Sequence, residues 1–243
     1  MQQNWYESWF DSTYYHLLYQ HRNEEEAENF LSRLLDRTHL PAPSNVLDLA
    51  CGKGRHSRYL HHCGHDVTGV DLSPENIKYC RQFENERLHF FEHDMRRVLR
   101  INYFDAVFNL FTSFGYFDRP SENERVIISA ASALQKGGYF IIDFLNAAFI
   151  MQHLTESQEL EREGVHFRIS RQISDNKIIK KIDILDGEIR QTFREEVGLI
   201  LPDQFKQWFA KAGLTVLNTY GDYHLGDYHS DSSQRLIFIT RKL

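Results

Sequence analysis

The feature that most constrains the fold is a regular alternation of short apolar runs and amphipathic segments. The apolar runs, which predict strands, cover residues 45–50, 66–70, 88–92, 104–110 and 138–145. The segments that predict helices lie near residues 54–62, 74–85 and 120–135. Strands and helices that alternate at this spacing form βαβ units, so we expect a mostly parallel, doubly wound α/β sheet whose ligands bind at the carboxyl ends of its strands.

Capping residues and a change of periodicity mark out the rest of the chain. Ser73-Pro74-Glu75 predicts a helix start, and Lys136-Gly137-Gly138 predicts the end of the helix before the fifth strand. Residues 165–198 alternate apolar and polar side chains, which predicts an antiparallel meander inserted into the α/β pattern. After it, a helix is expected at 202–212 and strands at 214–221 and 234–240, while the first 35 residues read as helical.

Length and composition limit the function classes. A chain of 243 residues with 42% hydrophobic content predicts one soluble domain with an elaboration. The formal charge of −6 is spread without a basic stripe, so a nucleic-acid partner is not expected. The longest apolar runs, such as 139–145, fall far short of the roughly 20 residues that cross a membrane. The start of the chain does not resemble a signal peptide, and we expect a cytoplasmic protein.

Cysteines and histidines do not predict a metal site. Cys51, Cys63 and Cys80 form no CxxC pair, which fits unpaired thiols in a reducing compartment. The cluster "HHCGH" at 61–65 lacks the spacing of zinc ligand pairs. No metal is therefore expected.

The turn Gly52-Lys53-Gly54 follows the first predicted strand and admits three kinds of nucleotide ligand. A P-loop requires Ser or Thr after the lysine, and this chain has Gly54 there. A dinucleotide fingerprint requires a third glycine where this chain has Ser57, which weakens that interpretation without excluding it. The third ligand is S-adenosyl-L-methionine, which carries no phosphate.

Acidic residues near the ends of the first three strands favour the third ligand. Asp48 would oppose a pyrophosphate but could hold an ammonium directly or through water, or could instead stabilise the turn. Asp71 is placed to accept hydrogen bonds from ribose hydroxyls, a role that an NAD enzyme would share. Asp94 can accept from an adenine amino group, with Met95 packed on the ring. The glycines would let the backbone approach the methionine part closely.

At this point the chain resembles the class I S-adenosylmethionine-dependent methyltransferases over residues 45–145. "VLDLACGKGRHSRYL", "VTGVDLS", "EHDM", "FDAVFNLFTSFGY" and "LQKGGYFIIDF" are similar to successive motifs of that family. The resemblance implies a seven-stranded Rossmann-like sheet with an antiparallel last strand, and S-adenosyl-L-homocysteine as product. The cofactor site that it implies comprises Asp48, Ala50, Gly52, Gly54, Arg55, Asp71, Leu72, Asp94, Met95, Asn109 and Leu110.

The resemblance extends to domain organisation. It implies an N-terminal helical cap over residues 1–40 and a cofactor-binding domain formed by 41–150 and 199–243. Residues 151–198 would be an inserted antiparallel subdomain that covers the substrate. We expect a monomer or a homodimer.

The segment after the fourth strand points to the kind of acceptor. It lacks the Asn/Asp-Pro-Pro-aromatic motif of many nucleic-acid and peptide methyltransferases. Instead "FTSFGYF" resembles a Ser-x-Gly-aromatic segment of glycine N-methyltransferase-like and amino-sugar N,N-dimethyltransferase-like enzymes. That likeness implies Tyr15 or Tyr19 near the transferred methyl, Tyr116 as hydrogen-bond partner or base, and Arg235 as an orienter of the acceptor. The alternatives are that the N-terminal tyrosines pack in the core and that Arg235 is a solvated edge residue.

These observations predict methyl transfer to a small molecule, with an amine favoured over oxygen or carbon. A small-molecule O- or C-methyltransferase, a nucleic-acid or protein methyltransferase, a non-catalytic cofactor-binding protein and an NAD-binding protein stay as alternatives. His224, in the loop before the last strand, is an alternative general base.

Overall fold

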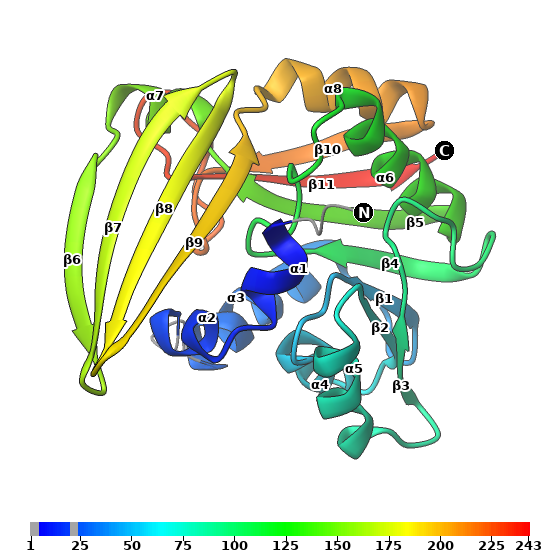
Figure 1. Ribbon diagram of the computed structural model, residues 1–243. Coiled ribbons are helices and arrows are strands. Elements are labelled where there is room, and N and C mark those ends of the chain that lie inside the picture. The colour runs from blue at the N-terminus through cyan, green and yellow to red at the C-terminus, as the bar shows by residue number, and fades with distance from the viewer. Residues whose placement is uncertain (1–4, 20–23) are drawn as a thin grey trace.

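A seven-stranded sheet forms the centre of the computed structural model, which describes residues 5–19 and 24–243 (Figure 1). Its strands are β1 (Asn45–Leu49), β2 (Asp66–Asp71), β3 (Leu88–Glu92), β4 (Phe104–Asn109), β5 (Leu134–Leu145), β10 (Leu214–Tyr220) and β11 (Arg235–Lys242). They lie in the order β10-β11-β5-β4-β1-β2-β3. The strands from β3 to β5 are parallel, whereas β11 is antiparallel to β5 and to β10. The predicted doubly wound sheet with an antiparallel last strand is confirmed.

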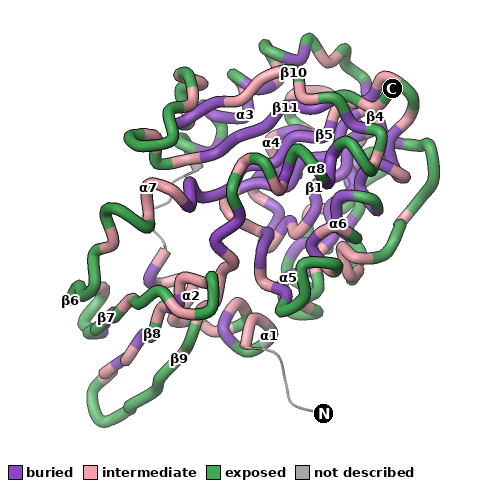
Figure 2. Tube along the Cα trace, turned by 90° about the horizontal axis from the view of Figure 1, so that it is seen from above, coloured by how far each residue is buried: buried purple, intermediate pink, exposed green. Residues whose placement is uncertain are grey.

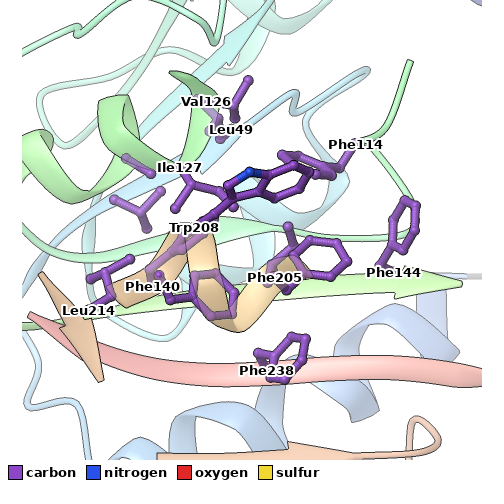
Figure 3. Packing of buried hydrophobic residues seen from close by; sticks show 14 of the residues in the cluster. Leu49, Phe114, Val126, Ile127, Phe140, Phe144, Phe205, Trp208, Leu214 and Phe238 are labelled. Atoms are coloured by element: carbon purple, nitrogen blue, oxygen red, sulfur yellow. The ribbon is translucent and has the colours of Figure 1, made fainter. Parts of the chain in front are cut away.

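Helices cover both faces of this sheet because its strands are apolar on both faces. The helices are α3 (Glu24–Thr38), α4 (Arg55–His62), α5 (Pro74–Cys80), α6 (Pro120–Ala133) and α8 (Pro202–Lys211). On one face, Phe140 of β5 packs with residues of α6 and α8, including Trp208 (Figure 3). On the other face, Ile141 packs with residues of α3 to α5, such as Phe30. Alternate residues of one strand therefore serve two cores.

A capping side chain sets the start of helix α5. α5 begins where the Ser73 side chain accepts a hydrogen bond from the Asn76 amide at 3.0 Å, as predicted. It ends at Cys80, earlier than expected, and a short 3-10 helix (Arg81–Phe83) follows.

The predicted helix end at Lys136-Gly137-Gly138 is wrong. α6 ends at Ala133, and these glycines lie inside β5. Gly137 has a φ of +82°, and a Cβ at Gly138 would lie 2.9 Å from the Asp105 carbonyl oxygen. The glycines therefore allow β5 to begin in close contact with the segment that forms β4.

A second, antiparallel sheet follows the short helix α7 (Ala147–Gln152). It consists of β6 (Ser157–Arg162), β7 (Val165–Ser174), β8 (Lys177–Asp186) and β9 (Ile189–Gly198), paired in that order. The predicted meander corresponds to β7, β8 and β9, and the prediction missed β6. Most of this sheet is exposed or half-buried, in contrast to the main sheet (Figure 2).

Two short helices, α1 (Trp5–Phe10) and α2 (Thr13–Leu18), lie between the two sheets (Figure 1). Trp9 and Leu18 are buried against apolar residues of β7 and β8, including Phe167 and Ile182. The inserted sheet thus supplies the core on which the start of the chain packs. In the part of the chain that the structure describes, no helix is long and apolar enough to cross a membrane.

Candidate active site

A cavity of about 390 Å³ lies at the carboxyl ends of the central strands, beneath α1 and α2. One set of lining residues comes from the turn after β1, from α4 and α5, and from the ends of β2 and β3. It comprises Ala50, Cys51, Gly52, Lys53, Arg55, His56, Arg58, Asp71, Leu72, Asn76, Tyr79, His93, Asp94 and Met95. The other set comes from α1, from α2 with the residue after it, and from the segment after β4. It comprises Tyr6, Phe10, Tyr15, His16, Tyr19, Leu110, Phe111, Ser113, Tyr116 and Phe117. We call these two sets the polar end and the aromatic end.

The turn after β1 depends on left-handed backbone conformations. Ala50, Gly52 and Gly54 have φ angles of +64°, +54° and +73°. A Cβ at Gly54 would lie 2.9 Å from the Phe90 ring, whereas no atom lies within 4 Å of the position of a Cβ at Gly52. Gly54 therefore serves packing against β3, and Gly52 leaves open space at the cavity wall.

Asp71, at the end of β2, fixes this turn with its carboxylate. Its two oxygens accept from the Gly52 amide at 2.8 Å and from the Ser73 amide at 2.9 Å. Burial raises the pKa of Asp71, although these hydrogen bonds act in the opposite direction. A carboxylate held in this way keeps lone pairs for further donors, which suits a ribose diol.

Asp48 lies beneath the turn and does not line the cavity. It is 1% exposed, and its carboxylate accepts from the Ser57 hydroxyl at 2.6 Å. Burial raises the pKa of Asp48 to about 6, and the Ser57 hydrogen bond opposes that rise. This placement matches the turn-stabilising alternative, and a contact with an ammonium stays a prediction.

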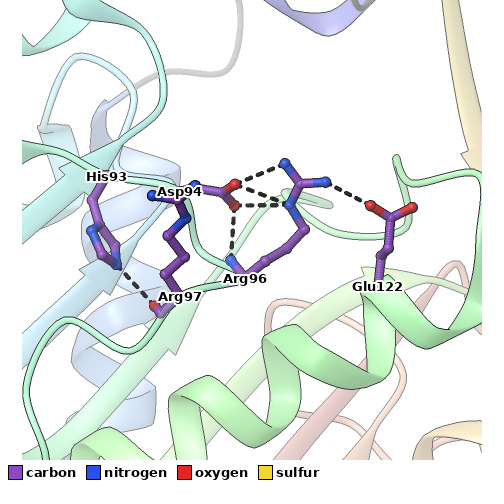
Figure 4. A network of polar contacts seen from close by, with 5 residues as sticks. All are labelled: His93, Asp94, Arg96, Arg97 and Glu122. Atoms are coloured by element: carbon purple, nitrogen blue, oxygen red, sulfur yellow. Dashed lines mark hydrogen bonds and ion pairs between the residues drawn. The ribbon is translucent and has the colours of Figure 1, made fainter.

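Asp94, after β3, is part of an ionic network (Figure 4). Arg96 contacts both of its oxygens, at distances of 2.7 to 3.1 Å, and also pairs with Glu122 at 2.6 Å. Burial alone would raise the pKa of Asp94, but the hydrogen bonds and charge of Arg96 hold it below its usual value. Asp94 is therefore a fixed, ionised acceptor at the cavity wall, with Met95 beside it.

The segment after β4 holds two successive residues, Phe111 and Thr112, at φ angles of +56° and +62°. Buried Asp143 accepts from the Phe111 amide at 2.8 Å, and its carbonyl oxygen accepts from the Thr112 amide at 3.1 Å. Arg235 pairs with the Asp143 carboxylate at 2.6 Å and donates to the Thr112 hydroxyl at 2.8 Å. This buried ion pair stabilises an otherwise unfavourable backbone.

Arg235 therefore supports the backbone of the aromatic end through Asp143 and Thr112. It does not line the cavity but borders a separate polar hollow between α3 and the loop before β11. His224 also lies in that hollow, away from the cavity. Direct contact of Arg235 with an acceptor stays a prediction.

The aromatic end consists of rings that contact one another. Tyr15 lies 4.9 Å from Tyr19 and 5.0 Å from Phe10, and Tyr116 lies 5.4 Å from Phe10, measured between ring centroids. The Tyr116 hydroxyl donates to the Thr112 carbonyl oxygen. Tyr14, in contrast, turns away and donates to Asp186 at 3.0 Å.

Glu195 of β9 joins this end to the inserted sheet. It accepts from the Trp9 indole at 2.6 Å and from the Tyr19 hydroxyl at 2.9 Å. Lys180 of β8 pairs with it at 3.2 Å and also donates to the Tyr19 hydroxyl. One carboxylate thus holds both N-terminal helices over the cavity.

Most residues expected at the site line the cavity together. They are Tyr15, Tyr19, Ala50, Gly52, Arg55, Asp71, Leu72, Asp94, Met95, Leu110 and Tyr116. Asp48, Gly54, Asn109 and Arg235 lie behind its wall. Asn109 is fully buried, and its amide donates to the carbonyl oxygens of Leu49 and Ser113, which ties β1 to the segment after β4.

Sequence reasoning missed several lining residues. Phe111, Ser113 and Phe117 lie inside the segment already singled out after β4, so that segment was the available signal. His16 and His56 gave none. Burial, and next the charge of Lys53, lower the pKa of His16 to about 4, and burial lowers that of His56 to about 3, so both imidazoles are uncharged at neutral pH.

The fold and the cavity define a class. A doubly wound sheet with a glycine turn after its first strand and acids at the ends of the next two binds a nucleoside-bearing cofactor. The residues present fit S-adenosylmethionine, because Gly52 leaves room at the turn and Asp71 and Asp94 offer acceptors without a phosphate-binding lysine motif.

Comparisons with known proteins identify the family. The model of the "Methyltransferase domain" family matches residues 46–138. A putative methyltransferase of Bacillus subtilis, YqeM, is 32% identical over 84% of this chain and 86% of its own length. A glycine/sarcosine N-methyltransferase of Aphanothece halophytica is 26% identical, with 91% and 83% covered. A dTDP-3-amino-3,4,6-trideoxy-alpha-D-glucopyranose N,N-dimethyltransferase of Streptomyces venezuelae is 30% identical, with 53% and 54% covered.

Among solved structures, an S-adenosylmethionine-dependent methyltransferase from Clostridium acetobutylicum shares the fold. Its TM-score is 0.79 at 18% identity, with 94% of this chain and 96% of that chain covered. The chain belongs to the S-adenosylmethionine-dependent methyltransferases. The predicted family, enzyme class and cofactor are confirmed.

Proposed function

We propose that this methyltransferase acts on a nitrogen atom of a small molecule. The observation that carries the proposal is a cavity that joins a polar end, suited to the cofactor, to an aromatic end beneath α1 and α2. The names of two relatives support nitrogen as the acceptor atom, since one is a glycine/sarcosine N-methyltransferase and the other an amino-sugar N,N-dimethyltransferase. The dispersed negative charge supports a small acceptor over nucleic acid.

The cofactor contacts that we propose follow the polar end. Asp71 would accept from the ribose hydroxyls, and Asp94 from the adenine amino group with Met95 against the ring. The methionine part would lie along the turn from Ala50 to Gly54, beside Arg55 and Leu110, with Leu72 next to the ribose. Asp48 and Asn109 would hold that turn from behind, and contact with the cofactor's ammonium stays open for Asp48.

The cofactor supplies a methyl group on a sulfonium, which is already a good leaving group. The protein's own part is then to exclude water and to orient the acceptor in line with the breaking bond. We assign orientation to Tyr15, Tyr19 and Tyr116 at the aromatic end. We assign Arg235 an indirect role, because it holds the backbone of Phe111 and Thr112 through Asp143.

Calorimetry and a transfer assay test the proposal. We expect S-adenosylhomocysteine to bind at micromolar concentration and NAD not to bind. Methyl-labelled cofactor incubated with a panel of small amines, phenols and an RNA duplex should label an amine. Binding of NAD without S-adenosylhomocysteine, or labelling confined to phenols or RNA, would contradict it. Ultracentrifugation would decide between the monomer and the homodimer that we also propose.

A further inference from the structure

Two cationic side chains of the polar end lie on aromatic rings at its α5 side. Lys53 Nζ is 5.4 Å from the centroid of the Tyr79 ring, and Arg58 Cζ is 4.7 Å from that of Phe83. Both rings belong to α5 and the short 3-10 helix after it. α5 follows the strand that ends at Asp71, so these cations lie on the side of the cavity proposed for the ribose.

Arg55 lies on the other side of the turn, where the polar end meets the aromatic end. Its Cζ is 4.3 Å from the centroid of the Phe111 ring, and β4, which precedes Phe111, flanks β1 opposite to β2. The His56 ring stacks on the same ring at 5.0 Å, and all three residues line the cavity. Burial, and next the charge of Arg55, lower the pKa of His56 to about 3, so the charge at this ring is that of Arg55.

The ring beneath Arg55 is held from behind. Phe111 has a φ of +56°, and Asp143 accepts from its amide at 2.8 Å. Arg235 pairs with Asp143 at 2.6 Å, and the Tyr223 ring packs on that of Phe111 at 5.0 Å. An unfavourable backbone conformation persists where its surroundings fix it, and such residues gather at binding sites. These contacts therefore set the place of the Phe111 ring, and with it that of the Arg55 guanidinium.

From this arrangement we infer that Arg55 pairs with the carboxylate of the cofactor's methionine part and that Phe111 is the positioning residue for this pair. The inference rests on the proposed function, which assigns Asp71 and Asp94 to the nucleoside. The carboxylate is then the anionic group of the cofactor that still needs a partner. A guanidinium offers parallel N–H donors to a carboxylate, and stacking on a ring orients it before the ligand arrives. The pair would make the site select ligands that carry the carboxylate over ligands that lack it.

Calorimetry with two ligands that differ only in this carboxylate tests the inference. They are S-adenosylhomocysteine and S-adenosyl-3-thiopropylamine, which is the same molecule without its carboxylate. We expect the wild type to bind S-adenosylhomocysteine at least about tenfold more tightly, because the analogue cannot form the hydrogen-bonded charge pair. Arg55→Met should reduce this preference to within about twofold. Equal affinities in the wild type, or a full preference in Arg55→Met, would overturn the inference.

Arg58→Met is the matched control, because it removes a ring-stacked cation about one turn further along α4. It should leave the ratio of the two affinities within about twofold of the wild-type ratio, even if both affinities change. Loss of the preference in Arg58→Met but not in Arg55→Met would place the carboxylate on the α5 side and refute the inference.

Variants of Phe111 test the positioning role. Phe111→Leu keeps an apolar side chain and removes the ring beneath the guanidinium, so the ratio should fall at least about threefold although Arg55 is still present. Phe111→Tyr keeps the ring and should keep the ratio. A merely structural role would lower both affinities by the same factor, so an unchanged ratio in Phe111→Leu would refute the positioning role. Failure of the wild type to bind either ligand would instead refute the proposed function and, with it, this inference.

Discussion

The two ends of the cavity are held together in different ways. At the polar end, the Asp71 carboxylate binds the amide of Gly52, 19 residues earlier, across adjacent parallel strands. At the aromatic end, Trp9 and Tyr19 reach Glu195 across 186 and 176 residues of chain. One end is therefore a product of consecutive βαβ units, and the other depends on contacts between the start of the chain and a sheet inserted late in it.

This difference has a consequence for stability. The polar end rests on buried strands of the main sheet. α1 and α2 have six residues each, far fewer than a helix needs to be stable alone, so their order depends on docking. We expect damage at the polar end to remove cofactor binding, and damage at the aromatic end to release the helices while the sheet stays folded.

The largest effect is expected for Asp71→Ala. The variant loses the acceptor proposed for the ribose diol and the hydrogen bonds that hold Gly52 and Ser73. The loss of two hydrogen bonds to a charged group costs about 4 kcal/mol of binding free energy. We therefore expect a roughly thousandfold lower affinity for S-adenosylhomocysteine in calorimetry.

Asp66→Ala is the matched control for this prediction. Asp66 lies at the opposite end of the same strand and pairs with Arg87 on the surface. Its loss should leave affinity within about twofold, since exposed ion pairs contribute little. Near wild-type binding by Asp71→Ala would refute the assignment of the polar end.

Asp48→Asn tests the buried carboxylate beneath the turn. Burial raises the pKa of Asp48 to about 6, so the native state keeps a proton that the unfolded state loses near its ordinary pKa of 3.8. The stability that this proton provides is present in acid and is lost as the pH rises from about 4 through about 6. Over the same interval, the free energy of unfolding of the wild type should fall by about 3 kcal/mol relative to that of the variant.

Urea denaturation at several pH values measures this difference. Ser57→Ala gives a change in the opposite direction, because it removes the hydrogen bond that lowers the pKa of Asp48. In that variant the loss of stability should extend to higher pH. A difference between Asp48→Asn and the wild type that does not vary with pH would show that folding leaves the pKa of Asp48 unchanged.

The polar end was accessible to sequence reasoning because its geometry is local. A strand followed by glycines, and acids at the ends of the next strands, place Gly52, Asp71 and Asp94 at one edge of any parallel sheet. The same reasoning failed at Lys136-Gly137-Gly138, where two uses of glycine compete. Glycine can end a helix, and it can also allow two strands to approach closely. Here the second use applies, because Gly138 lies too close to the Asp105 carbonyl oxygen for a side chain to fit.

The aromatic end was less accessible because long-range contacts decide it. Tyr14, Tyr15 and Tyr19 read alike in sequence, yet Tyr14 bonds to Asp186 while the other two line the cavity. Arg235 was predicted to orient the acceptor, but it does not line the cavity, and its partner Asp143 lies inside an apolar strand and was not considered. The left-handed backbone of Phe111 and Thr112 follows from that pair rather than from their own side chains.

A smaller effect is expected for Glu195→Ala at the aromatic end. Without the carboxylate, Trp9 and Tyr19 lose their acceptor and Lys180 its partner. Faster hydrogen exchange in α1 and α2, and about tenfold faster dissociation of S-adenosylhomocysteine, should accompany an unchanged exchange rate in β1 to β5.

Glu196→Ala is the neighbouring control on β9. Glu196 pairs with Lys177 at 3.1 Å and with Arg194 at 2.6 Å, and both of these partners lie in the inserted sheet rather than in α1 or α2. Equal exchange rates for α1 and α2 in the two variants would indicate that apolar packing alone holds the helices.

The smallest effect separates the two ends at a single hydroxyl. Tyr116→Phe keeps the ring against Phe10 and removes the hydrogen bond to the Thr112 carbonyl oxygen. A neutral hydrogen bond of about 1 kcal/mol corresponds to a roughly fivefold lower turnover with the amine labelled in the transfer assay. Affinity for S-adenosylhomocysteine should stay within about twofold, because the polar end is untouched. If affinity falls as much as turnover, Tyr116 serves the whole cavity rather than the acceptor, and the division into two ends fails there. If neither turnover nor affinity changes, the contribution of Tyr116 comes from its ring, whose packing against Phe10 is the same in the wild type and in Tyr116→Phe.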